Sequence, residues 1–188
     1  MFDIKHYIEA FTNLHTAKVK GHRAPHKAVL LLAIIDLIEE KEITAPRIEL
    51  TDKLENKFNA VWRRYLGTSA IFTPDITKPY FHMQHESFWR LLEYEEANVM
   101  MVSEETLLVS VNKETKKMPQ GSYSIKAMRN AFAYAEIDKM LFQLLQENDA
   151  RAILRVVLIN EYLTDQPTKT MPNLIKLIMA LPLITLVA

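Results

Sequence analysis

The sequence predicts an α+β fold, a mainly helical single domain with a small antiparallel β element. Apolar residues recur at helical spacing before residue 67 and again after residue 124. Between residues 70 and 112 the pattern changes to short β-branched or aromatic segments separated by polar breaks. A chain of 188 residues with 49% apolar residues is long enough to bury one core of ordinary size.

The first two helices are predicted from apolar spacing. Residues 3–17 carry apolar side chains at helical intervals, which is typical of an amphipathic helix. Residues 18–23 are a basic connection. Pro25 suits the first turn of the next helix, and residues 29–38 are apolar on nearly every side, so this helix should lie in the centre of the core.

A short extended piece and a third helix follow. Residues 47–50 read as extended, and Thr51 can cap a helix with Asp52 in its first turn. Leu54, Phe58 and Trp62 share one face of that helix, and Gly67 ends it.

The remaining elements are strands, then helices, then a tail. We expect strands or hairpins from residues 88–92, 99–102 and 107–111. Helical spacing returns over residues 124–145 and 150–163. Residues 1–163 would then form the domain, and residues 164–188 a polar linker and an apolar tail.

The tail has three interpretations. It completes the core as a final helix, it docks on a partner or a second copy, or the chain is a truncated or rearranged gene product. Its longest apolar run is too short to span a bilayer, which takes about 20 residues.

Composition excludes several classes. Lys+Arg and Asp+Glu are equal at 23 each, so no global positive field attracts nucleic acid, and any binding must come from local patches. Cysteine is absent, which removes disulfides, thiolate zinc sites and cysteine nucleophiles. No signal peptide is evident, and we expect a cytoplasmic protein.

Two segments carry the functional signal. Residues 21–27 place His22, Arg23, His26 and Lys27 at the opening turn of the apolar helix, where backbone N–H groups and the helix dipole favour an anion such as phosphate. Residues 78–83 set a proline and aromatic rings beside cations. Together they suggest a phosphate-reading site with an apolar pocket.

Charge is segregated along the chain. Residues 18–27 and 113–129 are basic, whereas residues 86–105 are acidic. These runs are either solvated surface charge or, for the two basic stretches, one phosphate-contacting face with the acidic segment turned away. The backbone contacts added by the second interpretation are Lys18, Lys20, Lys116, Lys117, Lys126 and Arg129.

Several ordered segments of the chain resemble a known protein family. The first is Arg23-Ala24-Pro25-His26-Lys27. The second begins with Pro79-Tyr80 and has Met83 four residues and Trp89 ten residues after the proline. These two segments resemble the sulfur-binding domain of type IV restriction endonucleases that act on phosphorothioated DNA. The later Tyr134-Ala135-Glu136-Ile137-Asp138, followed by Leu141-Phe142-Gln143-Leu144-Leu145, is also similar. The resemblance covers roughly residues 1–163. That family recognises a DNA backbone in which sulfur replaces a non-bridging phosphate oxygen, and the domain is commonly joined to an HNH nuclease.

The resemblance implies roles for individual residues. His26, Lys27 and Arg23 would meet the modified phosphate, and Pro79 would form an apolar wall of the sulfur pocket, with Tyr80 beside it. Two positions depart from the family, which often has an aromatic residue where this chain has Lys78 and a small residue where it has His82. The alkyl stem of Lys78 could replace some of the lost contact.

The chemistry of sulfur supports such a pocket independently of the family. Sulfur is larger, softer and a poorer hydrogen-bond acceptor than oxygen, so a proline ring buries it at little cost. Covering about 30 Å² of it gains only about 0.8 kcal/mol. Placing a phosphate oxygen in the same cavity costs about 1 to 3 kcal/mol. Selectivity would therefore come mainly from rejecting oxygen, and binding should weaken with salt.

Most of these residues also have structural interpretations. His26 could merely hydrogen-bond to the neighbouring backbone, and Pro25 could merely start the helix. Pro79-Tyr80-Phe81 could be a proline turn with core aromatics. Trp62, Phe88 and Trp89 are expected in the core rather than as stacking platforms. His82 and His85 could share a metal, but no third ligand is apparent and the segment does not read as helical. We expect no metal and no cofactor.

Two functions remain as hypotheses. The first is recognition of double-stranded DNA, preferably phosphorothioated, for a restriction or defence system. No HNH or paired-carboxylate motif is apparent, so cleavage would need a separate nuclease domain or chain. The second is a protein-interaction module that keeps the fold without sulfur selectivity and dimerises or binds a partner through residues 174–188. Neither involves a membrane.

Overall fold

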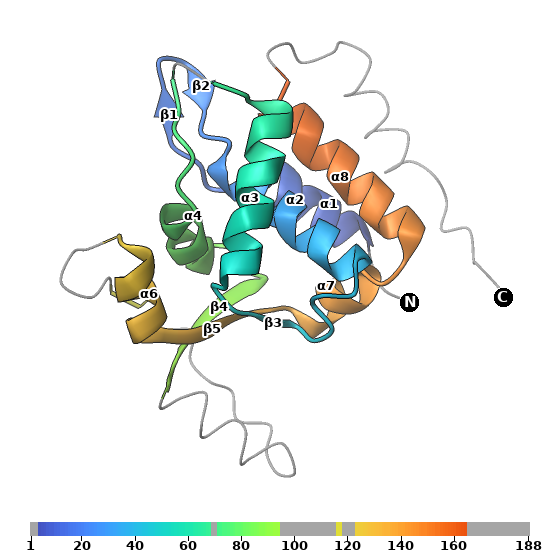
Figure 1. Cartoon of the computed structure of the whole chain (residues 1–188). Coiled ribbons are helices and arrows are strands. Elements are labelled where there is room, and N and C mark those ends of the chain that lie inside the picture. Colours follow the sequence, from blue (N-terminus) through green and yellow to red (C-terminus); the bar gives the residue numbers. More distant parts are fainter. Residues whose placement is uncertain (1–3, 69–70, 95–115, 118–122, 165–188) are drawn as a thin grey trace, which may run out of the picture.

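A central helix, α2 (His26–Glu39), organises the computed structural model, which describes residues 4–68, 71–94, 116–117 and 123–164. Eleven of its residues are buried, and it packs against α3, α4 and α8 (Figure 1). The run of apolar side chains on all sides explains this position, because such a helix is stable only when surrounded. The other elements are α1 (Ile4–Thr12), β1 (Lys18–Val19), β2 (His22–Arg23), β3 (Arg47–Ile48), α3 (Asp52–Tyr65), α4 (Thr77–His82), η1 (Met83–His85), β4 (Trp89–Glu93), α6 (Ile125–Ala131), β5 (Phe132–Ile137), α7 (Lys139–Leu144) and α8 (Asn148–Tyr162).

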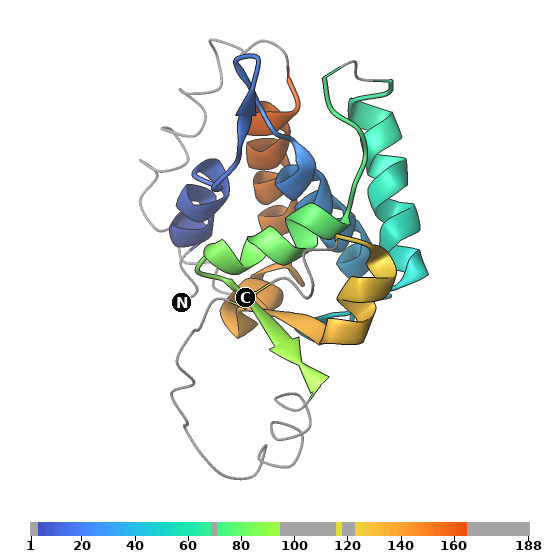
Figure 2. The same cartoon turned by 90° about the vertical axis from the view of Figure 1, so that its left-hand side faces the viewer.

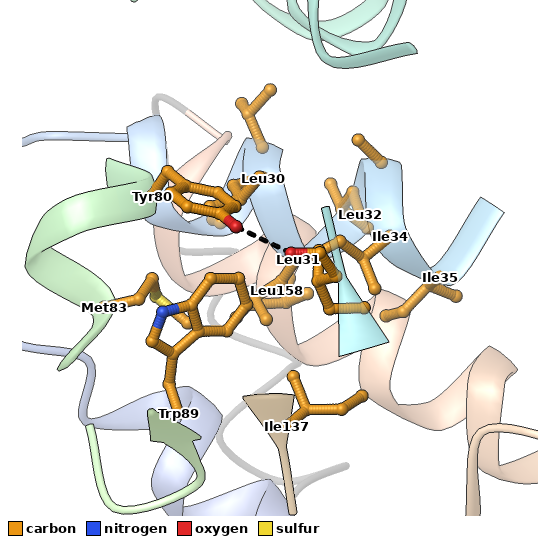
Figure 3. Packing of buried hydrophobic residues seen from close by; sticks show 14 of the residues in the cluster. Leu30, Leu31, Leu32, Ile34, Ile35, Tyr80, Met83, Trp89, Ile137 and Leu158 are labelled. Carbon is orange, nitrogen blue, oxygen red and sulfur yellow. Dashed lines mark hydrogen bonds between the residues drawn. The ribbon is translucent and has the colours of Figure 1, made fainter. Parts of the chain in front are cut away.

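The main sheet is antiparallel, with strand order β3-β5-β4. Leu91 pairs with Ala135, and Ile48 pairs with the same residue from the other side of β5. One face of the sheet packs beneath α2, where Trp89 and Ile137 lie among the leucines and isoleucines of the helix (Figure 3). The described residues therefore confirm the mainly helical α+β fold with a small antiparallel β element.

Several local predictions are confirmed. The Thr51 hydroxyl accepts a hydrogen bond from the Leu54 N–H and caps α3. Gly67, just beyond that helix, has a φ of +54°, the left-handed conformation that glycine adopts at helix ends. Trp62, Phe88 and Trp89 are core residues.

The predicted helix over residues 124–145 is wrong in its middle. Residues 132–137 form β5, the central strand, and only the flanking segments are helical, as α6 and α7. Aromatic and β-branched residues in this segment fit a sheet, and as β5 they hydrogen-bond to a neighbour on each side. These hydrogen bonds are made to strands from distant parts of the chain, so the helical spacing of the local sequence did not reveal the strand.

The segment around the second motif is helical, although its sequence pattern does not read as helical. Asp75 Oδ1 accepts hydrogen bonds from the Thr77 N–H and hydroxyl and so supports the start of α4. Pro79 lies in the first turn, where its missing N–H costs no helical bond. Helix α4 continues into η1, which corrects the interpretation that His82 and His85 lie outside a helix.

The first helix is shorter than predicted, and the basic connection has its own structure. Helix α1 ends at Thr12 rather than near residue 17. Strands β1 and β2 form a hairpin whose two turn residues, Lys20 and Gly21, both have positive φ, as a type I′ turn requires. The expected strands at 99–102 and 107–111 and the tail at 174–188 lie outside the described residues. Within the described ranges, no helix has the length and apolar character needed to cross a membrane.

Tyr80 provides a test of this packing. Its side chain is 1% exposed and its hydroxyl donates to the Ile48 carbonyl oxygen at 2.6 Å, the dashed line in Figure 3. We expect Tyr80→Phe to lower the free energy of unfolding by about 1–2 kcal/mol, because a buried carbonyl loses its donor. Urea denaturation measures this. Tyr94→Phe is the matched control, because the exposed Tyr94 hydroxyl donates to the Arg129 carbonyl; an equal loss in both variants would contradict the assignment.

Candidate functional site

One pocket brings the two sequence motifs together. It has a volume of about 580 Å³ and lies between the β1–β2 hairpin, the start of α2, residues 71–75, and the α4–η1 segment. In Figure 2 the hairpin and the chain that leads from α3 to α4 rise on two sides above α4. The motif residues that line it are His26, Lys27, Lys78, Pro79 and His82.

The pocket combines apolar and ionisable groups. Ala17, Val19 and Ala24 contribute from the hairpin side, and Ile71 and Phe72 from the segment before α4. His15 and His85 join His26 and His82, so four of the six histidines of the chain line this one pocket. Folding has therefore gathered side chains that are up to 70 positions apart in the sequence.

His26 joins the start of α2 to the wall of the pocket. Its Nε2 is 2.9 Å from the Thr73 carbonyl oxygen, and since a carbonyl only accepts, Nε2 carries the hydrogen. The ring contacts Trp62, with centroids 4.9 Å apart, and Phe72 at 5.8 Å. Burial lowers the pKa of His26, so the imidazole is neutral at neutral pH.

Lys27 lies at the base of the pocket in a buried ion pair. Its Nζ is 2.5 Å from Glu86 Oε1, and the two side chains are 7% and 5% exposed. Glu86 also accepts from the His15 backbone N–H at 3.0 Å and contacts His15 Nδ1 at 3.2 Å. Burial lowers the pKa of Lys27, whereas the hydrogen bond and charge of Glu86 oppose that shift. The Lys27 charge is thus compensated within the protein.

Lys78 and Pro79 form the part of the wall that comes from α4. The Lys78 side chain is 60% exposed, and its Nζ is 3.5 Å from Asp75 Oδ2. The nearby threonine hydrogen bonds and the Lys78 charge lower the pKa of Asp75 against the opposing effect of burial, so the carboxylate is ionised. Pro79 is buried and lines the same pocket.

His82 stands in a column of rings at one edge of the pocket. Its ring stacks on His85, with centroids 5.9 Å apart, and on Tyr123 at 5.6 Å. Its Nε2 is 3.0 Å from the Tyr123 hydroxyl. Burial lowers the pKa of His82, and the positive charges of Lys27 and Lys78 lower it further.

Two residues of the predicted site lie elsewhere. Tyr80 is in the core, which favours its interpretation as a core aromatic. The Arg23 guanidinium lies 4.3 Å from the centroid of the Tyr162 ring and donates to the carbonyls of Thr12 and Leu14. These contacts tie the hairpin to α1 and α8, so Arg23 has a structural role whatever else it contacts.

The additional basic residues do not gather at the pocket. Lys18 and Lys20 are exposed on the hairpin, and Lys126 is exposed on α6, on the other side of α4 (Figures 1 and 2). Arg129 donates to the Leu50 carbonyl and to Asp52, which fastens α6 to the start of α3. Lys117 is exposed, and the Lys116 backbone pairs with the Gln84 amide.

Sequence reasoning missed several residues of the pocket. Phe72, Asp75 and His15 carried no local signal apart from residue type. Glu86 was expected on a solvated acidic segment, which is wrong, because its carboxylate is buried beside Lys27. Only the fold reveals this partner, since Lys27 and Glu86 are 59 positions apart.

The fold and the pocket place this chain in a structural class: it is a mainly helical α+β protein with a cavity lined by both ionisable and apolar side chains. A scan against protein-family models matches no family, and a search of curated proteins finds no match. Among the described residues, no three or more His, Cys, Asp or Glu side chains are arranged to hold a metal ion.

The buried ion pair should dominate the stability of this region. We expect Glu86→Ala to lower the free energy of unfolding by about 3–5 kcal/mol, because Lys27 is left buried without its counter-charge. Glu42→Ala is the matched control, since the Glu42–Lys53 pair is exposed and its loss should cost at most about 1 kcal/mol. Urea denaturation compares them, and similar losses would show that the Lys27–Glu86 pair is not the stronger constraint.

The pocket histidines predict a pH dependence. For His26 and His82 the folded pKa is below the ordinary value of 6.5, so the unfolded chain takes up protons first as pH falls. Stability should therefore decline as pH drops through 6.5 and level off below the folded pKa values. Denaturation at pH 5 to 8 measures this. His26→Gln should flatten the decline, and an unchanged slope in this variant would contradict the assignment.

Proposed function

We propose that this chain binds double-stranded DNA through its backbone and recognises phosphorothioate-modified DNA as the recognition component of a restriction or defence system. The observation that carries the proposal is the pocket in which Pro79 and Phe72 lie beside Lys27 and Lys78. Such a cavity offers apolar contact to a sulfur atom, and the exposed Lys78 side chain at its wall is available to the phosphate that bears it. The chain has no cleavage role in this proposal, which assigns cutting to a separate HNH-type domain or chain.

The charge balance of the pocket favours selectivity for sulfur over oxygen rather than strong affinity for any phosphate. Lys27 is paired with Glu86, and Lys78 lies near Asp75, so each cation already has an acidic neighbour. His26 and His82 have lowered pKa values and add no charge at neutral pH. An ordinary phosphate therefore gains limited attraction while its oxygens lose water, which costs about 1 to 3 kcal/mol for each unsatisfied acceptor. A sulfur atom gives up weaker hydrogen bonds to enter.

The exposed cations of the hairpin supply the part of binding that does not depend on sulfur. Lys18 and Lys20 are exposed on the hairpin that contributes Ala17, Val19 and Ala24 to the pocket, although neither lysine lines it. In the proposed complex these side chains contact backbone phosphates outside the pocket, whatever the modification. Their contribution should fall as salt rises, because each phosphate contact releases condensed counterions.

The test compares a duplex with one stereodefined phosphorothioate and its unmodified twin at one fixed salt concentration. We expect a preference for sulfur of roughly tenfold or more, the sum of modest apolar gain and oxygen rejection. Pro79→Ala and His82→Ala should reduce the preference. Lys18→Ala should weaken binding to both duplexes alike, and neither duplex should be cut.

Pro46→Ala is the matched control for Pro79→Ala, because Pro46 lines a separate cavity of about 400 Å³ beside β3 and β5. Equal affinity for the two duplexes would reduce the site to a nonspecific basic surface. No binding to either would overturn the proposal and favour the protein-interaction module.

A further inference from the structure

The pocket is larger than a single phosphate group requires. At about 30 Å³ for each water-sized group, its volume of about 580 Å³ has room for roughly twenty non-hydrogen atoms, of which a thiophosphate supplies about five. Most of the space therefore lies beyond the proposed contact with Pro79 and the lysines. Apolar residues line much of that remaining space, so whatever occupies it should have an apolar face.

The lining of this extra space suits a flat aromatic group. Phe72 and Ile71 form one wall, and the Phe72 ring meets His26 edge-on, with an interplanar angle of 86°. His82 and His85 lie nearly parallel, at 18°, on another part of the lining. Nucleobases stack on aromatic rings of this kind whatever their sequence, because every base has a π-face.

Polar groups are available for the edge of such a base. Asp75 Oδ1 accepts from Thr77, whereas Oδ2 has only the longer 3.5 Å contact with Lys78 among its described partners. The carboxylate can therefore accept from an exocyclic amine. The exposed Lys78 side chain remains at the same pocket for a phosphate, whereas the Lys27 charge is paired with Glu86. Ring surfaces, an acceptor and cations thus occur together in one cavity.

We infer that the pocket holds a nucleotide unit, base together with phosphate, rather than a phosphate alone. The inference rests on the proposed function where the nucleotide belongs to DNA, because the base must then leave the duplex stack to enter. A free nucleoside monophosphate presents the same chemistry. Unstacking is the cost of entry from DNA, and contact with Phe72 and the other apolar residues of the lining offsets it.

The test places 2-aminopurine next to the stereodefined phosphorothioate in the duplex. Stacking on neighbouring bases quenches its fluorescence, so departure from the duplex stack should raise the signal on binding, and stacking on Phe72 in the pocket should keep that rise small. Anisotropy of a distant label reports binding itself. Phe72→Ala should raise the signal further, because the base loses its stacking partner in the pocket, and Ile71→Trp should suppress the rise by filling the cavity. Phe142→Ala, which alters the separate cavity beside β3 and β5, is the matched control and should behave like the parent protein.

The outcomes separate this inference from the proposed function. Binding of the duplex with no change in 2-aminopurine fluorescence overturns the inference and leaves DNA recognition intact. If no duplex binds, calorimetry with deoxyadenosine 5′-monophosphate and with inorganic thiophosphate decides. Binding of the nucleotide alone, weakened by Phe72→Ala, supports a nucleotide pocket without DNA recognition. Equal binding of both, or binding of neither, overturns the inference.

Discussion

The buried ion pair between Lys27 and Glu86 is the constraint on which the pocket depends. It joins the first turn of α2 to the residue that follows η1, and through the His15 N–H it also holds the chain between α1 and β1. Two charges withdrawn from water are stable only as a pair with good geometry. Because the pair fixes three segments around one point, the walls of the pocket have a defined spacing.

The same pair determines the electrostatics of the site. A lysine at the start of an apolar helix suggests a strong anion site, yet its charge is balanced by Glu86, and Asp75 lies near Lys78 in the same way. His26 and His82 are held towards their neutral forms by burial and by the neighbouring cations, which lower their pKa values. A cavity of this kind attracts anions weakly and penalises the loss of their water, which is the balance that the proposed discrimination between sulfur and oxygen requires.

Local patterns predicted the fold where local energetics decide it. Helix α2 followed from its continuous apolar run, and α3 from the Thr51 cap and Gly67. Strand β5 was not predicted because the spacing of its apolar residues fits a helix, while its residue types also fit a strand. Its extended form is selected by hydrogen bonds to β3 and β4, which come from distant parts of the chain. For the site, the motifs supplied the lysines and Pro79 but not their acidic partners.

The sequence by itself determined the fold class, the central position of α2 and the residue types that meet at the pocket, because apolar periodicity, caps and turn residues act over a few neighbouring positions. Only the tertiary structure decided which of these residues share the cavity. It placed Tyr80 in the core and Arg23 against Tyr162, and it set Glu86 beside Lys27. Burial and ion pairing act between residues that are distant in the chain, so no local pattern contains them.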